Sequence, residues 1–176
     1  IDEPNEQKKT PMHIATKNNC FPMIETLLEY QPNLRAQDQD GDTCVHMAIQ
    51  GRYCKGIDKF LEFIKPDLMP HNNKGETLLY KAVTMNPPNE EIIKTLVERG
   101  AKVNGAILNK LDELVKKQCK DKLPKIEAQY KIILKYLKNV AVHQNMRQQS
   151  LVAQDEQEQN TQLKLKQESK TEEIKL

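Results

Sequence analysis

The sequence is poor in the residues that mark several large classes of protein. Tryptophan is absent, only 5% of the 176 residues are aromatic, and only six are glycine. The four cysteines form no Cys-x-x-Cys pair, and no apolar run approaches the roughly 20 residues that a membrane helix needs. The N-terminal residues show no apolar region typical of a signal peptide. These absences disfavour a membrane span and a disulfide scaffold, and they predict reduced thiols in the cytoplasm or the nucleus.

The common motifs of catalysis and phosphate binding are also missing. The sequence contains no Gly-x-Gly-x-x-Gly and no Gly-x-x-x-x-Gly-Lys-Ser/Thr phosphate-binding loop. It also contains no Gly-x-Ser-x-Gly and no His-Glu-x-x-His motif. Cys44-x-His46 together with Cys54 lacks the spacing of a structural zinc site, which needs four ligands. We expect these cysteines, with Cys20 and Cys119, to pack as small apolar side chains or to lie free. The sequence therefore predicts a protein that is not an enzyme and that holds no cofactor or metal.

A six-letter pattern recurs along the first part of the chain at a nearly constant spacing. It reads TPMHIA at 10–15, TCVHMA at 43–48 and TLLYKA at 77–82, so the offsets are 33 and 34 residues. A threonine followed by proline is typical of the start of a helix, where the side chain accepts a backbone N–H. In DQDGDT (38–43) and NNKGET (72–77), a glycine lies two residues before the threonine, as a tight turn with positive φ requires.

A second apolar segment with helical periodicity follows each copy of the pattern. These segments are MIETLLEY (23–30), IDKFLEF (57–63) and EIIKTLVERG (91–100). The chain thus repeats a unit of turn, helix and helix. A fixed period of this size is the mark of a stacked repeat array.

The unit resembles the ankyrin repeat, in which a β-turn finger precedes two antiparallel helices with a Thr-Pro-Leu-His-x-Ala signature. The resemblance covers about residues 5–105 and implies an all-α ankyrin solenoid of about three helix-turn-helix repeats, at 5–38, 39–72 and 73–105. It also implies that His13 and His46 are structural residues, buried near the first-helix starts and bonded to loop backbone. The expected core residues of the second helices are Leu27, Leu28, Phe60, Leu61, Leu96 and Val97.

The sequence departs from the family pattern in two ways. Gln31-Pro32 and Lys65-Pro66 replace the usual Gly-Ala after the second helix, which only Gly100-Ala101 keeps, so proline is expected to stop these helices in another way. In the third copy, Tyr80 stands where the signature has histidine. We therefore expect a slightly irregular superhelix.

Residues 106–140 lack the finger and the signature but contain two amphipathic helical patterns. Their apolar faces consist of Ile107, Leu108, Leu111, Leu114 and Val115, and of Ile126, Tyr130, Ile133, Leu134, Leu137 and Val140. We interpret this pair as a degenerate fourth repeat that caps the array and completes a domain at 1–140. The polar tail, 141–176, is rich in Gln, Glu and Lys, and this composition leaves both disorder and an extended helix open.

The family resemblance implies that the chain binds one or more proteins in a concave groove, with no small-molecule substrate. Residues at the finger tips and on the groove side of the first helices would contact the partner. These candidates are Lys9, Lys17, Asn18, Gln39, Asp40, Asp42, Gln50, Arg52, Asn73, Lys74, Glu76, Thr84 and Met85. Since the set mixes both signs of charge, a partner with a mixed or basic patch is expected.

Narrower and different hypotheses remain open from the sequence. DGDTCVHMAI (40–49) resembles the first-helix sequence of I-kappa-B-type inhibitors. The abundance of Lys, Asn and Ile is compatible with a host-directed ankyrin effector. A start at Ile1 is compatible with a regulatory domain of a longer enzyme or channel. The last alternative is nucleic-acid binding through the cap lysines, which are Lys116, Lys117, Lys120, Lys122 and Lys125. The absence of arginine and of interleaved aromatics among them disfavours it.

Overall fold

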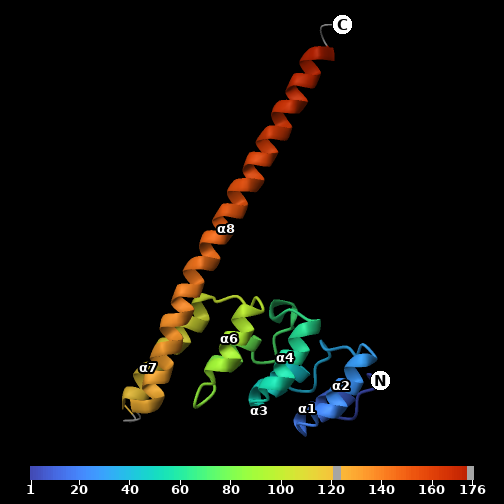
Figure 1. Ribbon diagram of the computed structural model, residues 1–176, viewed down its shortest axis with the longest axis vertical. Coiled ribbons are helices and arrows are strands. Elements are labelled where there is room, and N and C mark those ends of the chain that lie inside the picture. The colour runs from blue at the N-terminus through green and yellow to red at the C-terminus, as the bar shows by residue number, and fades with distance from the viewer. Residues whose placement is uncertain (121–123, 174–176) are drawn as a thin grey trace. The chain divides into compact units, whose positions relative to one another are not determined.

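The computed structural model describes the backbone of residues 1–120 and 124–173, and the side chains of residues 1–117, 124–155 and 157. Two units, Ile1–Lys138 and Asn139–Leu176, divide the chain. All regular structure in the described residues is helical (Figure 1).

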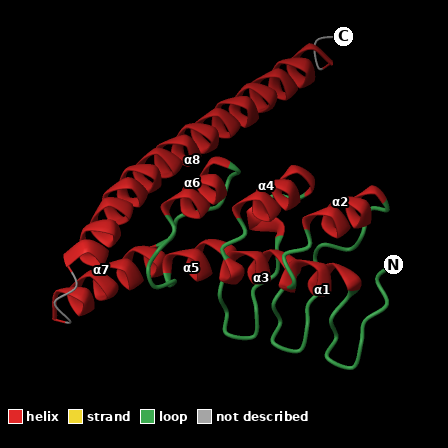
Figure 2. Ribbon diagram, turned by 60° about the horizontal axis from the view of Figure 1, so that its bottom comes forward, coloured by secondary structure: helices red, strands yellow, loops and turns green. Residues whose placement is uncertain are grey.

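The first unit contains three consecutive helix pairs. They are α1 (Pro11–Lys17) with α2 (Phe21–Glu29), α3 (Cys44–Gly51) with α4 (Cys54–Phe63), and α5 (Leu78–Val83) with α6 (Glu90–Glu98). The first helices form a row, because α1 packs on α3 and α3 packs on α5, while α4 packs on α6 (Figure 2). This arrangement confirms the predicted all-α repeat.

A threonine precedes the first helix of each pair. Thr10, Thr43 and Thr77 all have extended backbone angles. The hydroxyl of Thr43 accepts the N–H of His46 at 3.4 Å, and the hydroxyl of Thr77 accepts the N–H of Tyr80 at 3.0 Å. Such a cap stabilises a helix by about 1 kcal/mol, which matters for helices as short as these.

A finger with one recurring hydrogen-bonded turn leads into each of these helices. We call residues 5–9, 38–42 and 72–76 the first, second and third finger. The first residue of each finger, which is Asn5, Asp38 or Asn72, accepts the backbone N–H groups two and four residues later at 2.9–3.0 Å. Gly41 (φ 75°) and Gly75 (φ 73°) take the predicted positive φ, and Lys8 (φ 56°) takes it in the first finger without glycine.

The two helix ends that contain proline differ from each other. After α2, Gln31 adopts φ 51°, so it takes the left-handed conformation that Gly100 (φ 102°) adopts after α6. A residue other than glycine pays roughly 1–2 kcal/mol in steric strain there. After α4, Ile64 is extended at φ −144°, and the 3-10 turn Pro66–Leu68 follows.

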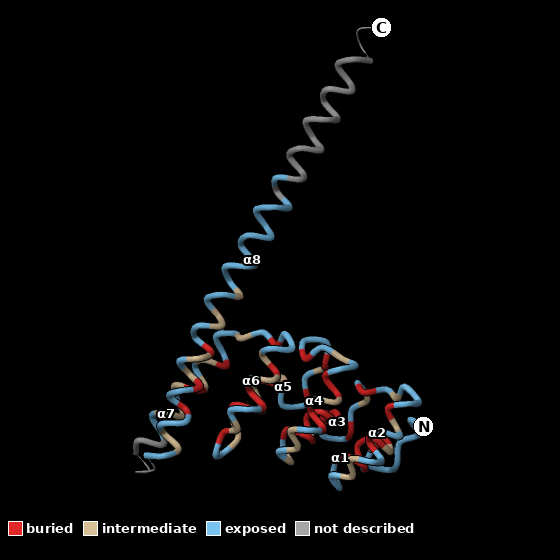
Figure 3. The backbone as a smooth tube through the Cα atoms, viewed as in Figure 1, coloured by how far each residue is buried: buried red, intermediate tan, exposed pale blue. Residues whose placement is uncertain are grey.

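The core runs through all the helix pairs of the first unit, as the buried segments in Figure 3 show. The predicted core residues that are at most 5% exposed are Leu28, Phe60, Leu61 and Leu96. Leu27 and Val97 are half-buried and pack against this core. The sequence pattern therefore identified the buried face of each second helix correctly.

The first unit ends with α7 (Gly105–Lys120) and the beginning of α8 (Pro124–Glu173). Helix α7 packs on α5 and so continues the row of first helices. The buried residues of this helix pair are Ile107, Leu111, Tyr130, Ile133 and Leu137. Only residues 99–104 connect α6 to α7, whereas residues 30–43 and 64–77 form the earlier connections, so no finger precedes α7.

In the second unit, the described backbone is helical as far as Glu173. Its largest apolar side chains among the described residues, including Met146 and Leu151, are more than half exposed. Within the part of the chain that the structure describes, none of the helices combines the length and the apolar character that crossing a membrane requires.

Candidate functional site

A groove of about 580 Å³ lies between the second and third fingers and the helices α3 and α5. Many of the predicted partner-binding residues line it together, although they come from two fingers, from α3 and from the segments that follow α3 and α5. They are Asp40, Asp42, Gln50, Arg52, Lys74, Glu76, Thr84 and Met85. Three further lining residues, Asn72, Lys81 and Asn86, were not among the candidates from the sequence.

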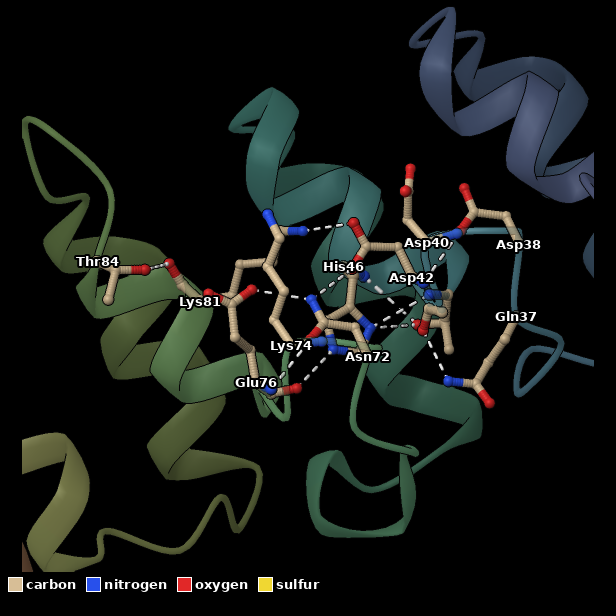
Figure 4. A network of polar contacts seen from close by, with 12 residues as sticks. Gln37, Asp38, Asp40, Asp42, His46, Asn72, Lys74, Glu76, Lys81 and Thr84 are labelled. Atoms are coloured by element: carbon tan, nitrogen blue, oxygen red, sulfur yellow. Dashed lines mark hydrogen bonds and ion pairs between the residues drawn. The ribbon is translucent and has the colours of Figure 1, made fainter. Parts of the chain in front are cut away.

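An ion pair forms part of this groove. The Nζ atom of Lys81 lies 2.5 Å from Asp42, and the side chains are 13% and 12% exposed, respectively. The amide of Asn72 donates to the other carboxylate oxygen of Asp42 at 2.9 Å (Figure 4). Burial of the Asp42 carboxyl raises its pKa, but the hydrogen bonds from Lys81 and Asn72 outweigh burial, so the pKa is lowered. Asp42 is thus an ionised group that the fold already pairs.

The sequence contained a signal for Lys81 that the candidate set did not use. Lys81 lies between Tyr80 and Ala82, at the position that Ile14 and Met47 occupy in the first two copies of the pattern. Ile14 is 42% exposed, and Met47 lines a smaller pocket with Lys17, Gln50 and Tyr53. This position thus changes from an apolar side chain in the first two repeats to a charged one, Lys81, which lines the groove, in the third.

The outer part of the groove carries both signs of charge. Asp40 and Lys74 are exposed, and Glu76 is half-buried with its carboxylate held by the Asn72 amide at 2.8 Å. Arg52 is exposed and donates to the carbonyl oxygen of Pro87 at 2.6 Å. Since these charges are solvated, their main contribution to binding would be orientation and selectivity rather than a large free energy.

The loop after α5 is held from two sides. The hydroxyl of Tyr130, a buried residue of α8, donates to the carbonyl oxygen of Met85 at 2.5 Å, and Arg52 holds Pro87. Burial raises the pKa of Tyr130, so its hydroxyl keeps the proton that it donates. The segment that contributes Met85 and Asn86 to the groove is therefore anchored by Arg52, directly after α3, and by Tyr130 of α8.

Two candidates at the finger tips are exposed but already engaged. The side-chain amide of Gln39 donates to the carbonyl oxygen of Glu6 at 2.9 Å, and that of Asn73 donates to the carbonyl oxygen of Gln39 at 2.8 Å. These amides connect neighbouring fingers. In the first repeat, Lys17 and Asn18 are exposed, and Lys9 is half-buried.

His13 and His46 have the structural role that the family resemblance implied. Both are at most 1% exposed. The Nδ1 atoms accept the backbone N–H of Thr10 at 3.2 Å and of Thr43 at 3.3 Å. Each Nε2–H then donates to the next finger, at the carbonyl oxygen of Asp42 (3.2 Å) or Glu76 (3.3 Å). Burial lowers the pKa of both imidazoles, which favours this neutral form.

The cysteines and the cap lysines form no site of their own in the described residues. Burial raises the pKa of Cys44 to about 12, and Cys20, Cys44 and Cys54 are free thiols. Among the described side chains, no group of three or more His, Cys, Asp or Glu could hold a metal ion. Of the cap lysines, Lys116, Lys117 and Lys125 are exposed. The side chains of Lys120, Lys122 and Cys119 lie outside the described residues.

Comparison with known proteins agrees with the fold. A family model for ankyrin repeats in three copies matches residues 1–69. Protein ACCELERATED CELL DEATH 6 of Arabidopsis thaliana is 27% identical over 111 residues, which are 54% of this chain and 17% of that relative. B-cell lymphoma 3 protein of Homo sapiens is 29% identical over 107 residues, which are 59% of this chain and 23% of that relative.

Rabankyrin-5 of Mus musculus is 30% identical over 95 residues, which are 53% of this chain and 8% of that relative. This chain thus spans less than a quarter of the length of each of these three relatives.

Proposed function

Because the chain is built from ankyrin repeats, we propose that it is a non-enzymatic module that binds a partner protein through its groove and finger tips. The observation that carries this proposal is the convergence of side chains from two fingers and two helices on one groove of about 580 Å³. The groove offers charge of both signs and a fixed backbone. Such a surface suits a protein segment better than a small apolar ligand.

Rigidity supports the same function. The groove is stabilised by the pair of Asp42 with Lys81, by the bonds between fingers and by the anchoring of Met85 to Tyr130. A surface that is ordered before binding loses little conformational entropy on binding. The exposed side chains can therefore determine which partner is selected, while the buried ones keep the geometry.

The proposed contact set keeps all the residues predicted from the sequence but divides their roles. Asp40, Arg52 and Lys74 would contact the partner directly. Asp42, Gln39 and Asn73 would act by holding the fingers in place. The half-buried Met47, which lines the smaller pocket, and the exposed Ile14 would add an apolar contact on α1 and α3, beside the groove.

The remaining parts of the proposal concern the cap and the cellular location. Residues 106–140 would cap the last repeat, since α7 continues the row of first helices and leaves its polar side outward. A cytoplasmic or nuclear location would accompany an adaptor, inhibitor or regulatory role, and it suits the free thiols of Cys20, Cys44 and Cys54.

Affinity capture with the full chain would test the groove. The test variant carries Asp40→Lys and Lys74→Glu, which reverse two exposed charges without touching the Asp42–Lys81 pair or the bond from Arg52 to Pro87. The control carries Lys59→Glu with Glu62→Lys, which exchanges the members of a surface ion pair on α4. A partner that is bound by the parent and the control, but lost by the test variant at an unchanged melting temperature, would support the proposal. Equal binding by all three proteins would contradict it.

A further inference from the structure

Neighbouring fingers are connected by a repeated pair of hydrogen bonds. The backbone N–H of Gln39 donates to the carbonyl oxygen of Gln7 at 3.2 Å, and that of Asn73 donates to Asp40 at 3.0 Å. The side-chain amide of Gln39 donates to Glu6 at 2.9 Å, and that of Asn73 donates to Gln39 at 2.8 Å. In every bond the donor belongs to the later finger and the acceptor to the earlier one, so the array of fingers has a direction.

Because every donor lies in the later finger, the backbone carbonyl acceptors of the last finger have no following finger to bond. The residues that correspond to Gln39 and Asp40 in the third finger are Asn73 and Lys74. Their carbonyl oxygens accept no hydrogen bond from the residues that the structure describes. The third finger therefore presents the same two acceptors as the second, without the finger that would supply the donors.

The surroundings of two equivalent glycines, Gly41 and Gly75, also show that the second finger is covered and the third is not. A Cβ atom on Gly41 would lie 2.5 Å from Oδ1 and 2.6 Å from the backbone nitrogen of Asn73, because the third finger covers the second. A Cβ atom on Gly75 would meet nothing within 4 Å. Gly41 is buried and Gly75 is exposed, although both have nearly the same φ, 75° and 73°.

The cap closes only half of this end. Helix α7 packs on α5, where the first helix of a further repeat would lie, and only residues 99–104 precede it. Tyr80 also replaces the histidine that would donate to a further finger. In the part of the chain that the structure describes, the helical position is thus filled, while no finger occupies the position next to residues 73–75.

We propose that this open edge of the third finger binds a finger-like turn of a partner protein that carries an asparagine or glutamine. The turn would donate a backbone N–H to the carbonyl oxygen of Lys74 and its side-chain amide to that of Asn73, as Asn73 itself does toward the second finger. A whole repeat of a second copy does not fit this position, because α7 lies where its first helix would go. The proposal is independent of groove binding, since it uses backbone acceptors at the array end.

The test is an NMR titration of the full chain with a cyclic peptide that has the sequence of residues 70–77, PHNNKGET. Saturable shifts confined to the amides of Asn73–Glu76 and Tyr80 are expected. The same peptide with Asn73→Asp should bind about tenfold more weakly or worse, because a carboxylate would face a carbonyl oxygen. Scattered shifts, or equal affinity of the two peptides, would overturn the proposal.

A matched pair of protein variants separates the edge from general effects on folding. Gly75→Asn keeps a residue that tolerates positive φ but places a side chain in the open position, and it should abolish the shifts. Gly100→Asn makes the same change at another positive-φ glycine with nothing within 4 Å, and it should leave them intact. Binding that survives Gly75→Asn would overturn the proposal.

Occupation of the edge before any peptide is added is checked in the same samples. A soluble paramagnetic chelate should broaden the Gly75 amide strongly at all protein concentrations if the edge is open. Protection at every concentration would show that another part of the chain fills the edge, and protection that grows with concentration would show self-association. Either result would overturn the assignment to a partner segment, and neither would affect the groove proposal.

Discussion

The first two repeats and the third differ at the place where one repeat meets the next. His13 and His46 reach from the start of a first helix to the backbone of the following finger, while Tyr80 occupies the equivalent position before a cap that has no finger. The signature histidine therefore connects two repeats as well as supporting its own helix. Its loss in the third repeat coincides with the loss of the acceptor that it would bond.

One position on the first helices also changes its polarity along the array. The exposed Ile14 of the first repeat and the half-buried Met47 of the second correspond to Lys81 in the third, and Lys81 pairs with Asp42 of the preceding repeat. The side chain at this position of the first helix thus changes from apolar to charged between the first two repeats and the third, although the backbone unit stays the same. In repeat proteins this separation lets surface residues vary while the stacked core is kept.

The largest expected effect is at the core that both regions share. Leu28→Ala should lower the free energy of unfolding by about 2–5 kcal/mol, because Leu28 is 3% exposed and its replacement leaves a cavity. Val97→Ala in the third repeat should lower it less, since Val97 is half-buried and loses fewer atoms. Urea unfolding of both variants measures the difference. A Leu28→Ala protein as stable as the parent would show that the helix register is wrong.

The contact between neighbouring repeats is tested by replacing the residue at the histidine position of the signature, which is His46 in the second repeat and Tyr80 in the third. His46→Phe removes the acceptor for the Thr43 N–H and the donor to Glu76, and it should cost about 1–3 kcal/mol of unfolding free energy. Tyr80→Phe should change stability by less than about 0.5 kcal/mol, because its hydroxyl makes no hydrogen bond among the described residues. Equal losses in urea unfolding would contradict a junction role for His46.

The equivalent glycines sharpen the comparison of a covered finger with an open one. Gly75→Ala should cost about 1–2 kcal/mol, which is the strain of a positive φ alone. Gly41→Ala should cost more, because its Cβ would also meet the backbone nitrogen of Asn73 at 2.6 Å. Thermal unfolding of the two variants side by side reports the difference. A smaller loss for Gly41→Ala would mean that the second finger is not covered.

The smallest effect is the pH dependence of stability. Burial lowers the pKa of His13 and His46 from the ordinary 6.5, against the opposing carboxylates of Asp38 and Asp42, so the unfolded chain binds protons more readily. The unfolding free energy should therefore fall as pH drops below 6.5 toward the folded-state pKa values. The double variant His13→Phe, His46→Phe should flatten this dependence between pH 7.5 and about 5. An identical slope in parent and variant would contradict it.

Local signals explain why much of the fold was predictable. The period of 33 and 34 residues, the threonines before each first helix and the glycines of the fingers each act within a few residues. They therefore identify the units and the helix starts, while the burial of His13 and His46 followed from the resemblance to the ankyrin repeat. Gln31 was less predictable, because glutamine has no preference for the left-handed conformation that it adopts at φ 51°.

The candidate site was predictable as a surface but not as a set of contacts. Position in the repeat placed Asp40, Arg52 and Lys74 on the groove, because the repeat geometry fixes which way these positions face. It could not show that Asp42 is paired with Lys81, or that the amides of Gln39 and Asn73 bond the preceding finger. Those contacts depend on the chemistry of side chains in two different repeats.

The sequence by itself determined the repeated unit, its helix pairs and the side that each buries, because periodicity and capping residues act locally. Only the tertiary structure decided which groove residues already bond within the chain, that Tyr130 of α8 holds the backbone of Met85, and that the carbonyl oxygens of Asn73 and Lys74 accept no hydrogen bond from any described residue. The physical reason is distance along the chain. These contacts join residues some 30 to 45 positions apart, and their geometry exists only when the repeats are stacked.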